Sequence, residues 1–377
     1  MNFCKLEKLQ DELTNVTVAG NDISVFVDGK EVYRRQAGYA DIESGRKMQG
    51  NELFFLWSGT KLFTCSLALR LIEDGKLKID APLSDYLPEF SDMIVQNGEG
   101  IVSAKAKIKI RNLFTMTAGF DYNFCRPSIE ETRKATGGRC PTREVMRAIA
   151  KTPLVYQPGE HFLYSMGHDV LGGVIEAVSG KRLCDYARET LFEPLGMNDT
   201  FFGIPTAAEQ DRMATQYLWR RDLKKAVPMK KTCGFILGEA YDSGGAGAVT
   251  TCSDYMKFAK TIANGGVAEN GYRYIKRETI DMWSQDELNA VQYADFRRDW
   301  GDGYSYGLGV KTIIDHAEYG ARDNYIDFGW GGAAGMRVHI CPNENIALVF
   351  MTHIHEYEGK KLFEKKLRNT VFECIMK

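Results

Sequence analysis

The sequence lacks several features that would assign it to a specialised class of protein. Neither sign of charge is in excess, since 48 lysines and arginines stand against 50 aspartates and glutamates. No apolar run is long enough to cross a bilayer, and none near the N-terminus is typical of a secretory signal. The nine cysteines are scattered, with no C-x-x-C pair. We therefore expect a cytoplasmic protein with reduced thiols, without a metal, a cofactor, a membrane or a nucleic acid as partner.

The residues that are present have the composition of a globular protein, with 44% hydrophobic residues in a chain of 377. Alternation of apolar and polar residues predicts hairpins over residues 22–40, around Asp28-Gly29, and over 336–354. Patterns typical of helices occupy the region between them and the segment after residue 358. We therefore expect an α+β fold, in which both chain ends form a mixed, mainly antiparallel sheet flanked by helices. We assign residues 1–80 and 235–377 to this sheet domain and residues 81–234 to an inserted helical domain.

Ser58 and Lys61 open the apolar segment "SGTKLFTCSLALRLIEDG", which is typical of a helix buried in a core. A hydroxyl and an amine three residues apart lie on one helical face. Serine becomes a nucleophile at neutral pH when a base takes its proton, and burial near a helix N-terminus favours the uncharged amine. Ser-x-x-Lys also arises by chance, so the pattern alone is a hypothesis.

Two further segments have residues suited to chemistry, Tyr164-Ser165-Met166 after a proline loop and Trp330-Gly331-Gly332-Ala333 before the last hairpin. Taken singly, such a tyrosine is usually a core residue, and such a glycine pair is usually a tight turn. The glycine-rich piece at 243–247 is followed by no lysine at the spacing of a phosphate loop, so it predicts no nucleotide site.

Together, in this order, these motifs make the sequence resemble the serine hydrolases related to penicillin-binding proteins and class C β-lactamases. The resemblance spans nearly the whole chain and is also carried by "DGKLKIDAPLSDYLPEF", "IKIRNLFTMTAGF", "LFEPLGMNDTFF" and "SGGAGAVTTCSDYMKFAK". The Tyr-Ser-x-x-x-Asp-Val-Leu-Gly and Trp-Gly-Gly forms are most similar to the carboxylesterase branch, often grouped as family VIII esterases. The resemblance implies a β-lactamase/transpeptidase-like fold.

The resemblance also implies a role for each motif residue. Ser58 is the nucleophile, Lys61 keeps it deprotonated or relays its proton, and Tyr164 is the base that later protonates the leaving group. The backbone N–H groups of Ser58 and Ala333 form the oxyanion hole, and glycines at 331 and 332 let substrate lie close to the strand. The sequence does not decide whether Lys61 or Tyr164 holds the proton.

Two departures from the family pattern bear on the substrate. Penicillin-recognising relatives carry a lysine or histidine where this chain has Trp330, and an asparagine where it has Met166. A charge-assisted hydrogen bond contributes about 1.5–3 kcal/mol, so anionic amides lose affinity. We expect Met166 and Trp330 to line an apolar pocket for a small neutral ester. The alternatives are a β-lactamase or a D-amino-acid peptidase or amidase on the same fold and, from a different class, an inactive ligand-binding domain. Acyl and alcohol specificity and oligomeric state stay open.

Overall fold

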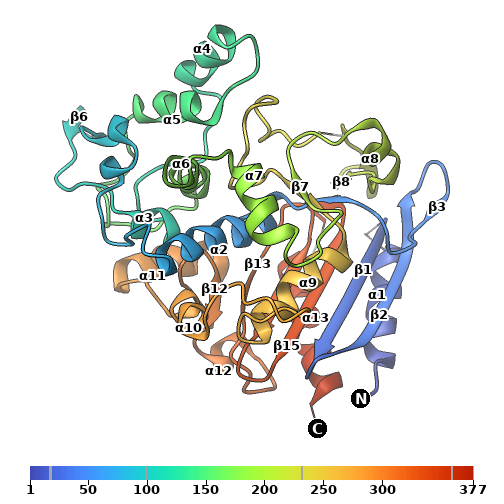
Figure 1. The fold of residues 1–377 in the computed structure, drawn as a ribbon. Helices are drawn as coiled ribbons and strands as arrows, with labels where there is room; N and C mark the ends of the chain where they lie inside the picture. The colour runs from blue at the N-terminus through green and yellow to red at the C-terminus, as the bar shows by residue number, and fades with distance from the viewer. Residues whose placement is uncertain (17–18, 99, 231, 358–359, 377) are drawn as a thin grey trace.

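An eight-stranded sheet organises the chain, in a computed structural model that describes residues 1–16, 19–98, 100–230, 232–357 and 360–376 (Figure 1). Every neighbouring pair of strands in this sheet is antiparallel. In spatial order the strands are β11 (Tyr304–Tyr306), β12 (Lys311–Ile313), β13 (Phe328–Gly331), β14 (Arg337–Cys341), β15 (Ile346–Thr352), β1 (Gly20–Val27), β2 (Lys30–Asp41) and β3 (Arg46–Lys47).

Both predicted hairpins are confirmed. β1 turns into β2 at Asp28 and Gly29, whose φ values of 48° and 83° are those that a tight two-residue hairpin turn requires. β14 and β15 form the second hairpin, and β15 also pairs with β1, so the two ends of the chain meet in the middle of the sheet. β1 and β15 are buried along their whole length, because helices cover both faces of the sheet.

The two faces of the sheet bear different helices. α1 (Cys4–Val16) and α13 (Lys360–Ile375) pack together on one face, where Leu9 and Leu367 share an apolar cluster with Ile23 and Leu348. α9 (Cys252–Ala263) packs on the other face, against β1, β14 and β15. α2 (Thr60–Glu73) and α10 (Arg277–Ser284) lie on that side as well and contact each other. Burial of its apolar face thus fixes each helix to the sheet.

α2 connects the sheet to the rest of the helices. It contacts β13 and also α6 (Gly167–Ser179), and most of its residues are buried, as the apolar segment predicts. The other helices are α3 (Ile110–Phe114), α4 (Pro127–Ala135), α5 (Thr142–Ala150), α7 (Leu183–Ala187), α8 (Ala207–Arg212), α11 (Ala290–Trp300) and α12 (His316–Tyr319). In Figure 1, α4 and α5 lie at the end of the molecule away from the two termini.

Three smaller sheets complete the fold of the residues that the structure describes. They are β4 (Phe54–Phe55) with β10 (Ala248–Thr250) and β7 (Phe201–Phe202), β16 (Ile354–His355) with β8 (Tyr217–Arg220) and β9 (Lys225–Pro228), and β5 (Ile94–Asn97) with β6 (Gly100–Ser103). β8 and β16 pair in parallel. All strands of the large sheet come from residues 20–47 and 304–352. The division into a sheet domain and an inserted helical domain stays our proposal.

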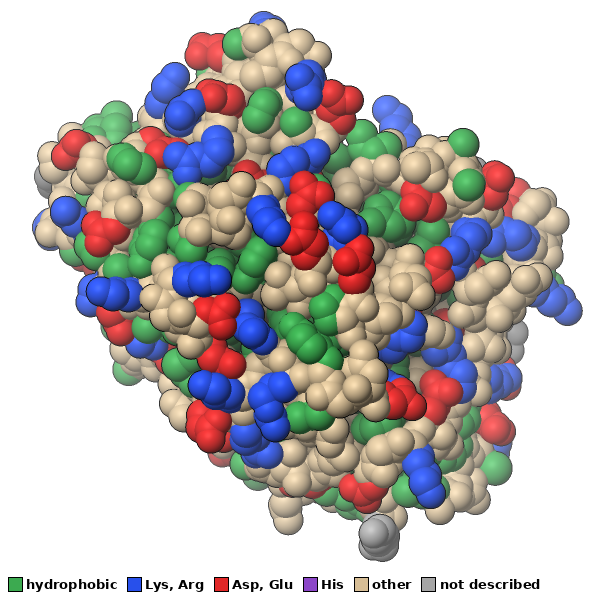
Figure 2. Space-filling view, in the orientation of Figure 1, with side chains coloured by type: hydrophobic (Ala, Val, Ile, Leu, Met, Phe, Trp, Pro, Cys, Tyr) green, Lys and Arg blue, Asp and Glu red, His purple; other side chains and the backbone are tan. Residues whose placement is uncertain are grey.

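The surface mixes both signs of charge. On the face drawn in Figure 2, lysines and arginines are interspersed with aspartates and glutamates, and apolar side chains occur in small groups. Within the described part of the chain, no helix has both the length and the apolar character needed to span a membrane.

Candidate active site

Ser58 lies in a short helical turn, Trp57–Gly59, immediately before α2. Trp57 has a φ of 51°, in the left-handed region that a non-glycine residue rarely adopts. Its indole N–H donates to Gln216 Oε1 over 2.8 Å, and this contact holds the unusual conformation in place. A Cβ at Gly59 would come within 2.7 Å of the Met336 sulfur, so the loop after β13 packs directly on this turn. The backbone at Ser58 is therefore fixed from both sides.

Lys61 is fully buried in the first turn of α2. Its Nζ donates hydrogen bonds to the Tyr122 hydroxyl over 3.0 Å and to the Gly245 carbonyl over 2.8 Å. It also lies 4.8 Å from the centroid of the Tyr164 ring. Neutral acceptors and aromatic ring faces thus surround this amine, and its direct hydrogen bonds go to a phenol and a peptide group.

Tyr164 is held between two aromatic rings, those of Tyr122 and Trp330. The centroid distance is 5.5 Å in each case, with interplanar angles of 20° and 27°. The Trp330 indole Nε1 donates to the Tyr164 hydroxyl oxygen over 3.3 Å. Trp330 is thus a neighbour of the predicted base as well as a wall of the cavity.

Tyr122 was not among the residues selected from the sequence. Burial, then the neighbouring Tyr164 and Asp169, raise the pKa of Tyr122 well above its usual value, so it stays a neutral phenol. It therefore acts as a hydrogen-bond partner of Lys61. A single tyrosine just beyond the "TMTAGF" segment has no motif of its own, so only the fold reveals its place.

Asp169 and the glycine-rich segment form a support behind Lys61. Oδ1 of the buried Asp169 accepts hydrogen bonds from Tyr241 Oη over 3.0 Å, Ser243 Oγ over 2.6 Å and the Gly245 N–H over 3.2 Å. Gly245 thus donates its N–H to Asp169 and accepts at its carbonyl from Lys61. Burial raises the pKa of Asp169, while Lys61 and these hydrogen bonds oppose the rise. The segment seen in the sequence as a glycine repeat therefore positions the amine.

Ser58 and Tyr164 open into one cavity of about 210 Å³. Its other lining residues are Trp300, Lys311, Trp330, Gly331, Gly332, Ala333, Arg337 and Glu364. The structure thus brings Ser58, Tyr164 and the whole Trp-Gly-Gly-Ala segment together, with Lys61 behind them. The cavity wall is partly charged, whereas the sequence predicted an apolar pocket.

Of three residues predicted to bind substrate, the structure places Gly331 and Gly332 at the cavity and Met166 away from it. Met166 does not line the cavity: it is buried at the start of α6, where its backbone N–H donates to Asp121, and its side chain belongs to the core. Gly331 and Gly332 do line it, but packing already requires glycine at both positions. A Cβ would lie 2.4 Å from Arg337 Nη1 at the first and 2.3 Å from the Leu56 carbonyl at the second.

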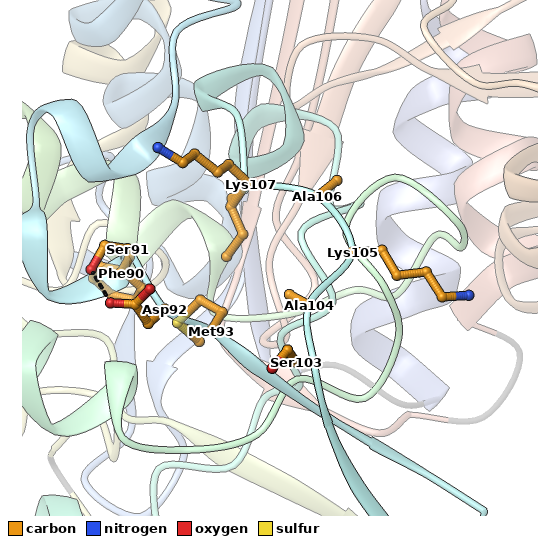
Figure 3. A pocket seen from close by; sticks show the side chains of 10 residues that line it. Phe90, Ser91, Asp92, Met93, Ser103, Ala104, Lys105, Ala106 and Lys107 are labelled. Atoms are coloured by element: carbon orange, nitrogen blue, oxygen red, sulfur yellow. Dashed lines mark hydrogen bonds between the residues drawn. The ribbon is translucent and has the colours of Figure 1, made fainter.

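A second hollow, of about 260 Å³, lies between residues 90–93 and 103–108. Figure 3 shows that the Lys105 and Lys107 side chains extend from it in opposite directions, while Ser91 donates to Asp92 over 2.9 Å. Its polar groups do not converge on a common point, which a catalytic site requires. The cavity at Ser58 is therefore the candidate active site.

The family and the relatives of this chain define a serine hydrolase. A model of the family described as Beta-lactamase matches residues 8–368, and the chain belongs to this family. It is 29% identical over 354 residues to Esterase EstB of Burkholderia gladioli, covering 88% of this chain and 84% of that protein. It is 28% identical over 353 residues to lovastatin esterase of Penicillium rubens, covering 84% of each.

A similar solved structure is that of EstCE1, described as a hydrolase with promiscuous acyltransferase activity. It matches this chain with a TM-score of 0.80 and 25% identity, covering 98% of this chain and 97% of that one. The β-lactamase/transpeptidase-like fold that the sequence predicts is therefore confirmed.

Proposed function

We propose that this protein is a carboxylesterase that hydrolyses small esters through an acyl-enzyme intermediate. The observation that carries the proposal is that Ser58 and Tyr164 share one cavity, with the Lys61 Nζ 4.8 Å from the Tyr164 ring centroid. Relatives named as esterases support the same activity. The proposal includes action on a small molecule in the cytoplasm, in keeping with the scattered cysteines and balanced charge of the sequence.

In the acylation step, Ser58 Oγ attacks the carbonyl carbon of the ester and gives its proton to the base formed by Tyr164 and Lys61. The bond between the acyl carbon and the alcohol oxygen then breaks, and the alcohol leaves with a proton from Tyr164. The backbone N–H groups of Ser58 and Ala333 are the proposed donors to the negative oxygen that develops on the carbonyl.

In the second step, water takes the place of the alcohol. Tyr164 accepts a proton from the water, whose oxygen attacks the acyl carbon, and Ser58 leaves with its proton restored. Tyr122 and the Gly245 carbonyl hold the Lys61 amine beside Tyr164 through both steps, since both accept hydrogen bonds from it.

The nucleophile is tested by replacing Ser58. We expect Ser58→Ala to lower kcat for a short-chain 4-nitrophenyl ester on the order of 10⁴-fold, because no acyl-enzyme can form. Mass spectrometry after treatment with a fluorophosphonate probe should find the label on Ser58. Unchanged turnover in the variant, or a label on another residue, would contradict the assignment.

The same measurements separate the alternatives. Nitrocefin hydrolysis as fast as ester hydrolysis would favour a β-lactamase, and release of D-alanine from a D-dipeptide would favour a peptidase. Saturable ligand binding without any acyl-enzyme would favour the inactive ligand-binding domain.

A further inference from the structure

The cavity has a charged wall that the catalytic steps above do not use. Lys311 of β12, Arg337 of β14 and Glu364 of α13 all line it together with Ser58 and Tyr164. Their side chains are only 12%, 8% and 16% exposed. These three residues are called here the cationic wall. They come from the two strands that flank β13 and from α13.

The cationic wall contains more positive than negative charge. Glu364 accepts from Lys311 at one carboxylate oxygen and from Arg337 Nε, over 2.8 Å, at the other. Burial raises the pKa of Glu364, but Arg337 and Lys311 outweigh it and hold the pKa well below its usual value. Two cations and one carboxylate therefore leave a net formal charge of +1 in a largely aromatic and glycine-lined cavity.

The two cations also have donors to spare. Lysine has three N–H donors and arginine five. Among the described residues, Lys311 donates only to Glu364, and Arg337 donates to Glu364 and, through Nη1, to the carbonyls of Met336 and Gly332. Glu364 uses one carboxylate oxygen for each cation, which leaves the remaining N–H groups of Lys311 and Arg337 for a ligand. These donors lie at the wall of a cavity, where a ligand can reach them.

The position of Arg337 relates the cationic wall to the reacting bond. Its Nη1 lies so close to Gly331 that a Cβ there would be 2.4 Å away, and Gly331 and Gly332 line the cavity next to the proposed oxyanion donor Ala333. A substrate extended along β13 from Ser58 therefore reaches the guanidinium within the same cavity of about 210 Å³.

We propose that the cationic wall is a binding subsite for a carboxylate carried by the ester substrate, remote from the bond that is cleaved. This inference rests on the proposed esterase function and specifies its substrate class. In the penicillin-recognising relatives, a cation at the position of Trp330 binds the substrate carboxylate. Here Lys311 and Arg337 would bind a carboxylate at a different place in the cavity. The sequence predicts a small neutral ester, and this inference differs from it: the bond that is cleaved belongs to a neutral ester group, but the far end of the substrate carries an anion.

The proposal is tested with pairs of esters in which a carboxylate is exchanged for the neutral carboxamide. One pair places the carboxylate on the acyl group, with mono-4-nitrophenyl adipate against 4-nitrophenyl 5-carbamoylpentanoate. The other places it on the leaving group, with 4-acetoxybenzoate against 4-acetoxybenzamide. We expect kcat/KM to be about 10- to 100-fold higher for the carboxylate in at least one pair, because a charge-assisted hydrogen bond forms. The preference should shrink as salt is added.

Two variants change the charge of the cationic wall in opposite directions. Lys311→Met should lower the ratio of kcat/KM for the anionic to the neutral ester about tenfold, and Glu364→Gln should raise it. Because each ratio is taken on one protein preparation, partial unfolding cancels from it. Lys181→Met removes an ion pair with Glu189 outside the cavity and should leave the ratio unchanged.

A binding measurement makes the inference independent of turnover. Calorimetry on Ser58→Ala protein compares monomethyl adipate and 4-acetamidobenzoate with their carboxamides, and the carboxylates should bind about tenfold or more tightly. Equal affinities, with no charge preference in either ester pair, would overturn the proposed subsite. Absence of all ester turnover and of labelling at Ser58 would instead count against the esterase function, and calorimetry would still decide the subsite.

Discussion

The active-site region contains the fully buried Lys61 and the partly buried Lys311, each near a carboxylate, and the two pairs are built differently. Lys311 bonds directly to Glu364, whose pKa is held low. Gly245 lies between Lys61 and Asp169. Its carbonyl accepts a hydrogen bond from Lys61, and its N–H donates to the Asp169 carboxylate. The pKa of Asp169 is raised.

The difference fits the role that we propose for each lysine. A lysine paired directly with a carboxylate keeps its charge, which suits a residue that attracts an anion. A lysine held by a phenol and a carbonyl is kept in place without a bonded counter-charge, which suits a residue that exchanges a proton with its neighbours. Three predictions test this contrast.

Replacing the two lysines in turn should give the largest difference. We expect Lys61→Met to lower kcat for a neutral 4-nitrophenyl ester on the order of 10³-fold, since the residue takes part in proton transfer. Lys311→Met should lower it far less, because the neutral ester has no carboxylate for it to bind. Steady-state kinetics, with circular dichroism to verify folding, measures both. Equal losses would mean that the two lysines share one role.

The two carboxylates should affect stability with opposite pH dependence. The pKa of Glu364 is lowered on folding. The carboxylate therefore contributes to the free energy of unfolding at pH values above its ordinary pKa of 4.5, and this contribution is lost as the pH falls. Glu364→Gln should therefore lower the free energy of unfolding at pH 7 by about 3 kcal/mol, since two buried cations lose their partner, and less at pH 4. Urea unfolding of both proteins between pH 4 and pH 7 measures this difference in the free energy of unfolding.

Asp169→Asn is the matched variant for that experiment. Because the pKa of Asp169 is raised above 3.8, protonation favours the folded protein, and the stability that this group contributes below that value is lost as the pH rises above it. The difference between wild type and Asp169→Asn should thus change with pH in the opposite sense to that of Glu364→Gln. The same sense in both variants would refute the contrast.

The smallest expected effect comes from the residue between Lys61 and Asp169. A Cβ at Gly245 would lie 2.3 Å from Asp169 Oδ2 and 3.0 Å from Tyr122 Oη. We expect Gly245→Ala to lower the free energy of unfolding by about 2 kcal/mol and to lower kcat, because the support of Lys61 must shift. Gly234→Ala is the control, as a Cβ there meets nothing within 4 Å. Equal effects of the two substitutions would show that the segment is not tightly packed.

Local patterns in the sequence predict the elements that carry the motif residues. Alternation and the Asp28-Gly29 turn predict the first hairpin, and the nearly uncharged segment after Ser58 predicts a buried helix. These signals suffice because each depends on neighbouring residues alone. That Ser58, Lys61 and Tyr164 lie close together depends on long-range packing, and only the family resemblance predicted it.

The cationic wall and the support of Lys61 had no comparable signal. Lys311, Arg337 and Glu364 are ordinary charged residues of two strands and a helix, and only the packing of α13 against the sheet buries them together. The expectation for Met166 failed for a similar reason, since this N-cap residue of α6 is buried in the core rather than at the cavity. Which way a side chain points at the end of an element is decided by its tertiary neighbours.

The pairing of β1 with β15 has a consequence for biosynthesis. Gly20 accepts a hydrogen bond from Thr352, 332 positions further along the chain, so the middle of the sheet cannot close until β15 has left the ribosome. Closing so long a loop is slow, and a nascent chain meanwhile exposes the unpaired edge of β1 and its apolar side chains. Chaperone protection during translation is therefore expected to raise the yield of this protein.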